Sequence, residues 1–188
     1  MKAMQVRAPG EALALAEVDR PEPGKDEVLL KVNACGVNFA DTLMVKGTYQ
    51  ETPEFPFAPG MEVCGTVVAG DGFPAGTRVA AMVGSGGFAE YVTAPAMACV
   101  PVPDAMSDAD AAAFLIAYGT AHLGLADRAG LQPGESLLVL GAAGGVGLTA
   151  IEVGKLLGAR VIACARGAAK LEVARQAGAD HLIDSAAD

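Results

Sequence analysis

The chain has 188 residues, of which 52% are hydrophobic and 19% are charged, and its formal net charge is −9. This composition is typical of a globular protein with ample core, in one large domain or two small ones. Glycine, proline and charged residues interrupt every apolar run before it is long enough to cross a membrane. The negative charge argues against nucleic acid as a partner, because phosphate binding needs clustered positive charge.

The sequence also indicates the compartment in which the protein works. Its first residues form a strand-like segment rather than the apolar region of a signal peptide, which predicts a cytoplasmic location. The four cysteines lie singly in apolar segments, at Cys35, Cys64, Cys99 and Cys164. We therefore expect buried free thiols and no disulfide in a reducing compartment.

Short β segments separated by glycine and proline fill residues 1–100. We expect a hairpin that joins residues 1–8 to 12–18, and one short helix over 39–46 that begins near Asn38 or Asp41. The further strands are expected at residues 26–34, 60–70, 77–83 and 87–93. Many short strands with frequent turns are typical of a small, irregular β barrel or sandwich.

Helical and buried-strand patterns replace these segments after Pro103. Ser107 is the expected N-cap of an alanine-rich stretch that runs, with breaks, over residues 109–129. Leu137–Leu140 is predicted to be a strand buried on both faces, as in a parallel sheet. Two more strands are expected at residues 160–165 and 179–184, with helices over 148–158 and 168–177 between the three. The second part of the chain is therefore a βαβαβ unit.

A glycine-rich turn joins the first strand of this unit to its helix, and it consists of Gly141, Ala142, Ala143, Gly144, Gly145, Val146 and Gly147. Ala142 stands where a GxGxxG motif has its first glycine, and Gly144 and Gly147 take the second and third places. Such a turn brings backbone N–H groups and a helix N-terminus up to a diphosphate. The alternative is a turn that binds nothing, and the strand–turn–helix context favours the dinucleotide site.

The nucleotide-binding part of the chain is incomplete. A doubly wound nucleotide-binding domain contains two βαβαβ halves, whereas this sequence contains one. The strand over residues 137–140 would then lie at an open edge of its sheet. We therefore expect the chain to be a fragment of a longer protein.

Three motifs carry a resemblance that spans essentially the whole chain: Ala-Cys-Gly-Val-Asn-Phe-Ala-Asp at residues 34–41, Pro-Gly-Met-Glu-Val-Cys-Gly at 59–65, and the stretch from residue 127 through the glycine turn. Together they resemble the medium-chain dehydrogenase/reductase superfamily, and within it the zinc-free NADPH:quinone oxidoreductase (zeta-crystallin-like) branch. The resemblance implies an α/β protein: a GroES-like β-rich catalytic domain over residues 1–112, and the first half of a Rossmann NADP-binding domain over residues 113–188. It also implies a homodimer for the full-length protein.

The same resemblance indicates an enzyme without a metal. Asn38 and Met61 stand where zinc-dependent relatives have a cysteine and a histidine, and an amide and a thioether are poor zinc ligands. The two histidines, His122 and His181, are expected at the surface. We therefore expect no metal site, and hydride transfer from NADPH to a small quinone or α,β-unsaturated carbonyl, whose product anion is delocalised.

Asn38, Asp41 and Tyr49 match positions that line the cleft beside the nicotinamide in this family. The resemblance implies that Asn38 donates a hydrogen bond to a carbonyl oxygen or to the cofactor, and that Tyr49 contacts substrate or donates a proton. Two alternatives stay open. Asp41 can instead cap the short helix, and Tyr49 can be a loop aromatic packed on the barrel.

Three further residues are assigned to the cofactor. Thr120 matches a threonine near the nicotinamide ribose, although a helix-interior hydroxyl bonded to the previous turn explains it equally well. Arg166 and Lys170 follow the second strand, where an NAD-specific site has a carboxylate. No carboxylate is expected there to repel a 2′-phosphate, so the two cations favour NADPH over NADH. The alternative is that both are solvated charges.

Two other functions remain candidates. The first is an enoyl-thioester reductase of the same superfamily, with Tyr49 as the proton donor. The second is a non-catalytic NADPH-binding or structural protein.

Overall fold

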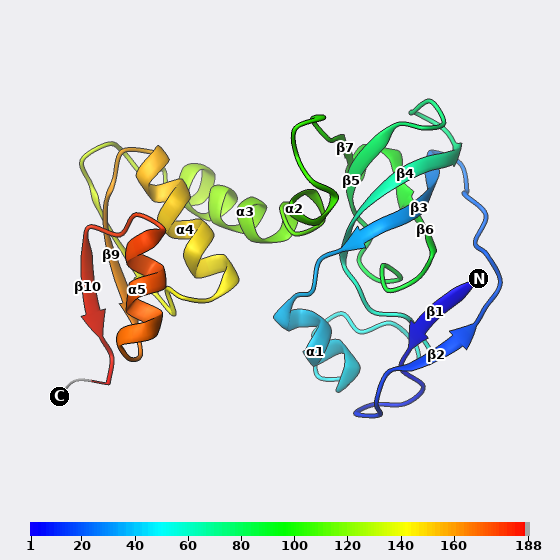
Figure 1. The fold of residues 1–188 in the computed structure, drawn as a ribbon, viewed down its shortest axis with the longest axis horizontal. Helices are drawn as coiled ribbons and strands as arrows, with labels where there is room; N and C mark the ends of the chain where they lie inside the picture. Colours follow the sequence, from blue (N-terminus) through cyan, green and yellow to red (C-terminus); the bar gives the residue numbers. More distant parts are fainter. Residues whose placement is uncertain (187–188) are drawn as a thin grey trace. The chain divides into compact units, whose positions relative to one another are not determined.

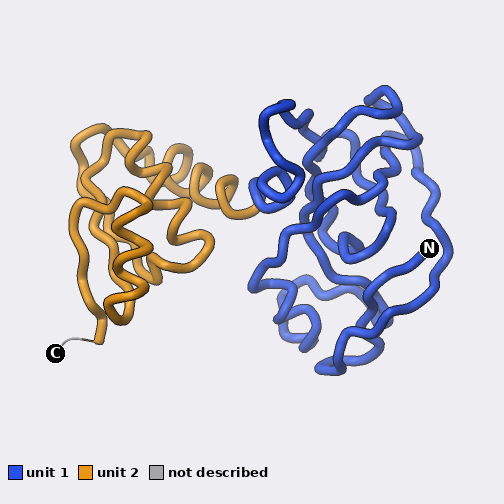
Figure 2. Tube along the Cα trace, viewed as in Figure 1, with its two compact units in different colours: residues 1–115 blue, residues 116–188 orange. Residues whose placement is uncertain are grey.

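The computed structural model describes residues 1–186, and the chain divides into two compact units, residues 1–115 and 116–188 (Figure 2). The first unit consists mainly of antiparallel strands. The second is built from parallel strands and helices (Figure 1). The α/β fold predicted from the sequence is therefore confirmed.

A five-stranded antiparallel sheet forms the centre of the first unit, in the order β6-β3-β4-β5-β7. The strands are β3 (Glu27–Cys35), β4 (Glu62–Gly70), β5 (Arg78–Met82), β6 (Tyr91–Pro95) and β7 (Cys99–Pro101), with the 3-10 turn η1 (Ala96–Ala98) before the last. Alternating apolar residues of these strands, among them Val28, Leu30, Val63 and Val79, form a fully buried core. A hairpin of β1 (Lys2–Gln5) and β2 (Ala14–Glu17) lies beside the sheet, as predicted.

Two strands differ from the prediction. The strand expected from residue 87 begins at Tyr91, because Gly87 and Phe88 donate their N–H groups to the carbonyls of Gly60 and Pro59 instead of entering the sheet ladder. Strand β7 was not expected at all. Its three residues give too short a pattern to separate from a loop.

Helix α1 (Phe39–Val45) and helix α2 (Asp108–Ala112) complete the first unit. Ser107 caps α2 as predicted, since its Oγ accepts a hydrogen bond from the Asp110 N–H at 3.1 Å. Arg78 on β5 pairs with Asp108 at 3.1 Å and donates to the carbonyls of Pro103 and Met106. These contacts attach α2 and the segment before it to the sheet.

The second unit contains a three-stranded parallel sheet in the order β10-β9-β8. Its elements are α3 (Leu115–His122, which begins at the boundary), the π-helical segment η2 (Leu123–Arg128), β8 (Ser136–Leu140), α4 (Gly145–Leu156), β9 (Arg160–Ala165), α5 (Ala168–Gln176) and β10 (His181–Asp184). Ile151 of α4 and Ala174 of α5 are fully buried against Val139, Val161 and Ala163 of the sheet. The predicted βαβαβ unit is confirmed.

The prediction that β8 is buried on both faces is wrong for this structure. Only Val139 is buried, whereas Leu138 and Leu140 are 53% and 71% exposed. The reason is that β8 is an edge strand and both helices that follow it pack on the Val139 side. No helix within residues 1–186 has the length and apolar character needed to span a membrane.

Candidate functional site

The glycine turn between β8 and α4 has the geometry of a phosphate-binding turn. Gly141 adopts a φ of +62°, which favours glycine, while Ala142 is completely buried and donates its N–H to the carbonyl of Cys164 at 3.1 Å. The left-handed residue is therefore Gly141, which explains why alanine can stand at the position of the first motif glycine.

The other two motif glycines play different parts. A Cβ on Gly147 would lie 2.5 Å from the Gly141 carbonyl oxygen and 2.8 Å from Ala142 Cα, so only glycine allows α4 to start this close to β8. A Cβ on Gly144 would meet one atom, at 3.4 Å, and one on Gly145 would meet nothing within 4 Å. The outer side of the turn is thus open where the first N–H groups of α4 lack partners within the helix. This arrangement fits the diphosphate of a dinucleotide.

A hollow of about 520 Å³ lies at this end of the sheet, lined by Leu140, Gly141, Ala143, Gly144, Cys164, Ala165, Arg166, Lys170 and Ser185. Arg166 follows β9 directly, Lys170 lies in the first turn of α5, and both side chains are exposed. The structure therefore brings the predicted cations together with the glycine turn. Ser185, which sequence reasoning missed, adds a hydroxyl group from the residue after β10.

The expectation that no carboxylate lies near these cations is corrected by Asp184, the last residue of β10. Its Oδ1 accepts hydrogen bonds from the N–H groups of Gly167 and Ala186, each at 2.9 Å. These two hydrogen bonds, and the charge of Arg166 close by, hold the pKa of Asp184 below its usual value. The sequence places Asp184 one strand away from Arg166, and parallel pairing of β10 with β9 brings them together.

Thr120 lies on α3, exposed and outside this hollow. Helix α3 is held against α4 by Thr149, whose Oγ1 donates to the Ala117 carbonyl at 3.0 Å, and by the hydrogen bond from Tyr118 to Glu152. That hydrogen bond raises the pKa of Tyr118. The position of Thr120 relative to the glycine turn is therefore fixed, and its contact with the ribose stays a prediction.

In the first unit, Asn38 and Asp41 meet at the start of α1. Asp41 is 3% exposed; its Oδ2 accepts from the Asn38 N–H at 2.8 Å and its Oδ1 from the Gly60 N–H at 2.9 Å. These contacts confirm that Asp41 caps the helix, and they also tie α1 to the loop before β4. A direct part for Asp41 in the reaction stays a prediction.

Glu62, at the start of β4, is the partner of the Asn38 side chain. Asn38 Nδ2 donates to Glu62 Oε1 at 3.0 Å, and Glu62 is 2% exposed. A Cβ on Gly36 would lie 2.7 Å from the Glu62 side chain, so glycine is required at position 36. Burial, with the nearby charges of Asp41 and Glu62, raises the pKa of the Cys35 thiol to about 12. Glu62 lies within the motif of residues 59–65, but no local pattern predicts its contact with Asn38.

Tyr49 lies apart from Asn38, in a loop after α1. It packs against the cluster of Val6, Met44 and Phe57 and lines a second hollow of about 370 Å³. The other residues of this hollow are Met44, Glu51, Thr52, Pro53, Met61, Val83, Gly84 and Ser85. Tyr49 is therefore both a packed aromatic and the wall of a cavity of small-molecule size.

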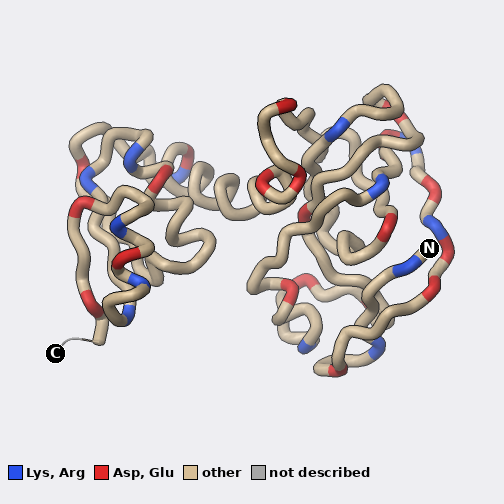
Figure 3. The backbone as a smooth tube through the Cα atoms, viewed as in Figure 1, with Lys and Arg blue, Asp and Glu red and all other residues tan. Residues whose placement is uncertain are grey.

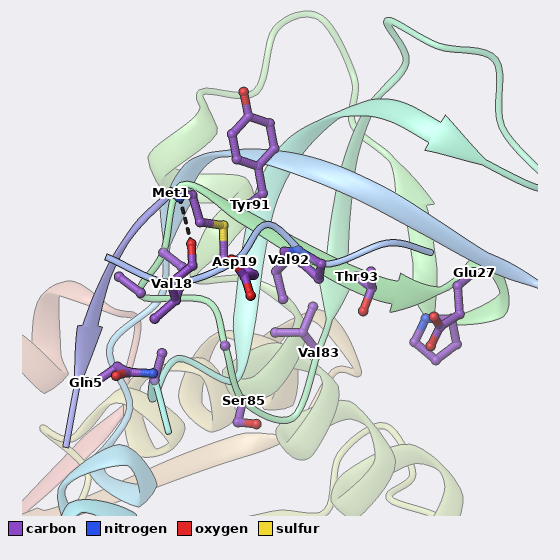
Figure 4. Close-up of a pocket in the computed structure, with 16 residues that line it drawn as sticks. Met1, Gln5, Val18, Asp19, Glu27, Val83, Ser85, Tyr91, Val92 and Thr93 are labelled. Carbon is purple, nitrogen blue, oxygen red and sulfur yellow. Dashed lines mark hydrogen bonds between the residues drawn. The ribbon is translucent and has the colours of Figure 1, made fainter. Parts of the chain in front are cut away.

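A third hollow, of about 550 Å³, opens between the start of the chain and β6 (Figure 4). Its walls include Gln5, Asp19, Tyr91 and Thr93, and the amino terminus is held beside it by a hydrogen bond of 2.7 Å to the Val18 carbonyl. None of the predicted site residues lines it.

Side chains of the types that bind metal ions are dispersed over the structure. Residues 1–186 contain no group of three or more His, Cys, Asp or Glu side chains that could hold a metal ion. His122 and His181 are exposed, as predicted, and all four cysteines are free, with Cys64 and Cys99 buried and the other two half-buried. Both signs of charge are distributed over each unit (Figure 3).

Comparison with known proteins identifies the family. Residues 24–104 match the alcohol dehydrogenase GroES-like domain, and residues 145–188 match the zinc-binding dehydrogenase family. The quinone oxidoreductase of Thermus thermophilus, solved also in complex with NADPH, is 41% identical with a TM-score of 0.90, over 99% of this chain and 60% of that one. The chain belongs to the medium-chain dehydrogenase/reductase superfamily.

Two curated proteins are similar to most of this chain, and the name of the first supports the quinone oxidoreductase-like branch. The quinone oxidoreductase-like protein 2 homolog of Nematostella vectensis is 41% identical over 167 residues, which are 86% of this chain and 46% of that protein. The human synaptic vesicle membrane protein VAT-1 homolog is 40% identical over 168 residues, 87% of this chain and 43% of that protein. The chain thus spans about half the length of these relatives.

Proposed function

We propose that this chain belongs to a zinc-independent, NADPH-dependent oxidoreductase that transfers hydride to a quinone or an α,β-unsaturated carbonyl. The observation that carries the proposal is the hollow in which the open glycine turn meets Arg166 and Lys170. The NADPH complex of the Thermus thermophilus relative supports the same cofactor. When bound, NADPH supplies the hydride.

Residues of this chain bind the cofactor and orient the reacting groups. The N–H groups of Gly145 and Val146, the first residues of α4, bind the diphosphate, and the two cations bind the 2′-phosphate. Asn38, which does not line the hollow beside Tyr49, donates to a carbonyl oxygen or to the cofactor: its amide nitrogen carries two hydrogens, and Glu62 accepts one of them. The buried carboxylate thereby fixes the orientation of the amide.

The donor atoms of this chain are unsuited to a catalytic zinc ion. Asn38 and Met61 offer an amide and a thioether at the two aligned ligand positions, and neither is a ligand that Zn²⁺ prefers. These residues do not fit the metal. A delocalised product anion makes a metal unnecessary for a quinone or enone acceptor.

The cavity beside Tyr49 supports a small, largely apolar acceptor. Met44, Met61 and Val83 supply apolar walls, and thioether groups make favourable contacts with aromatic rings. The phenol of Tyr49 supplies one polar group on the wall of the same cavity. The Tyr49 phenol also favours the second candidate, an enoyl-thioester reductase in which Tyr49 donates the proton.

A non-catalytic NADPH-binding or structural protein is the third candidate. NADPH consumption, followed by its absorbance with a small quinone, an enone and an enoyl thioester, distinguishes the three candidates. Oxidation by the quinone or enone supports the proposal, and oxidation by the thioester alone supports the second candidate. Saturable NADPH binding without oxidation by any acceptor supports the third.

A further inference from the structure

Asp184 lies beside the hollow that contains Arg166 and Lys170. It does not line the hollow, but it precedes the lining residue Ser185 and accepts hydrogen bonds from Gly167 and Ala186, the chain neighbours of Arg166 and Ser185. It ends β10, beside the turn from β9 to α5 (Figure 1). A fixed negative charge at a site for a 2′-phosphate needs an explanation, because like charges repel.

The hydrogen bonds of Asp184 give it a structural part. A single oxygen, Oδ1, accepts from Gly167 N–H and from Ala186 N–H, both at 2.9 Å. Gly167 has a φ of +83° and is the N-cap of α5, so the first of these bonds fixes the turn that carries Arg166. The second fixes the residues just after β10, where Ser185 lines the hollow. Asp184 therefore ties together two walls of the site.

The charge of Asp184 has a separate effect. Asp184 pairs with Ala165 of β9, the residue before Arg166, so its carboxylate and the guanidinium of Arg166 belong to neighbouring strand ends. When a 2′-phosphate enters, the same carboxylate opposes it, and it offsets part of the attraction that Arg166 and Lys170 exert.

We propose that Asp184 sets the cofactor preference of this hollow, by positioning the turn that carries Arg166 and by opposing the 2′-phosphate of NADPH. The inference rests on the proposed function, since it assumes that the hollow takes the adenosine end of the cofactor. It predicts that the ratio of NADPH affinity to NADH affinity is smaller than Arg166 and Lys170 alone would produce.

Two substitutions separate the two effects. Asp184→Asn keeps an Oδ1 that accepts both N–H groups and removes the charge, so NADPH should bind about fivefold more tightly, while NADH binding should stay within about twofold. Asp184→Ala removes both the charge and the hydrogen bonds that fix the turn after β9. NADH should therefore bind more weakly to Asp184→Ala than to Asp184→Asn. The matched control is Asp180→Asn, which removes one charge at the other end of β10, where Asp180 pairs with Lys155 and accepts from Val161 N–H.

Fluorescence titration of the full chain and these variants with NADPH and NADH is the test. A larger ratio of NADPH to NADH affinity in Asp184→Asn, absent from Asp180→Asn, supports the proposal. An unchanged or smaller ratio in Asp184→Asn overturns it, even if the unmodified chain prefers NADPH and the proposed function stands. Conversely, the unmodified chain could bind NADPH and NADH equally while Asp184→Asn prefers NADPH. That result contradicts the proposed NADPH dependence and supports the proposed role of Asp184 in cofactor preference. Failure of every variant to bind either cofactor overturns both.

Discussion

Replacing Gly147 by alanine should destabilise the second unit, because the new methyl group has no room. Its Cβ would lie 2.5 Å from the Gly141 carbonyl oxygen, 2.8 Å from Ala142 Cα and 2.9 Å from the Ala142 carbonyl carbon. All three are backbone atoms, so no side-chain rotation relieves the overlap. Inserting a methyl group into a packed site typically costs about 1–3 kcal/mol.

Part of that cost is returned, since alanine favours a helix over glycine by up to about 1 kcal/mol. Because the methyl group meets only backbone atoms, its cost should lie near the upper end of that range, and the expected net loss is about 2 kcal/mol. Each 1 kcal/mol lowers the melting temperature of a unit of this size by about 4–8 °C. Circular dichroism during heating measures the change in melting temperature. NADPH affinity should fall as well, because α4 must move away from β8.

Gly145→Ala is the matched comparison in the same turn. Its methyl group meets nothing within 4 Å, so stability should be equal to or above that of the unmodified chain. The methyl group nevertheless enters the space proposed for the diphosphate, and NADPH affinity should fall. If Gly147→Ala melted as high as Gly145→Ala, the close approach of α4 to β8 would be refuted as the reason for glycine at 147.

Three further predictions concern charge and burial. Arg166→Ala should weaken NADPH binding about tenfold, as expected for one charge-assisted hydrogen bond, and leave NADH within about twofold in parallel titrations; an equal loss for both would argue against 2′-phosphate recognition. Asp41→Asn should lower the free energy of unfolding of the first unit, measured in urea, by about 1–3 kcal/mol. The reason is that an amide N–H₂ must face one of the N–H groups of Asn38 and Gly60. Unchanged stability would show that the cap contributes little. The pKa of the Cys64 thiol is raised from 9.0 to about 12, mainly by burial and then by its hydrogen bond to Asp108. Above pH 9 the folded state therefore binds more protons than the unfolded state, and the free energy of unfolding should fall as pH rises from 9 towards 12. Cys64→Ala should show a shallower fall over that range, and an identical slope would contradict this account.

The parts of the fold that the sequence predicts well are those that neighbouring residues determine. The cap of α2 follows from Ser107 and Asp110, and the glycine turn follows from small residues between an apolar strand and an amphipathic helix. The parallel direction of the three strands follows because a helix connects each strand to the next. Each of these signals lies within a short stretch of chain.

The parts that the sequence does not predict depend on contacts between distant residues. Gly87 leaves the ladder because Gly60, far earlier in the chain, accepts its N–H. The amide of Asn38, the N-cap of α1, meets Glu62 at the start of β4. Asp184 reaches the turn after β9 only once β10 has paired with β9. The exposure of Leu138 and Leu140 depends on which strand and helix cover β8, which no local pattern records.

The measurement that tests the central claim most directly is a fluorescence titration of the unmodified chain with NADPH and, in parallel, with NADH. Saturable binding, tighter for NADPH than for NADH, is the result expected if the glycine turn, Arg166 and Lys170 form a dinucleotide site. Equal affinity for the two, or binding of neither, would contradict the claim that this hollow recognises NADPH.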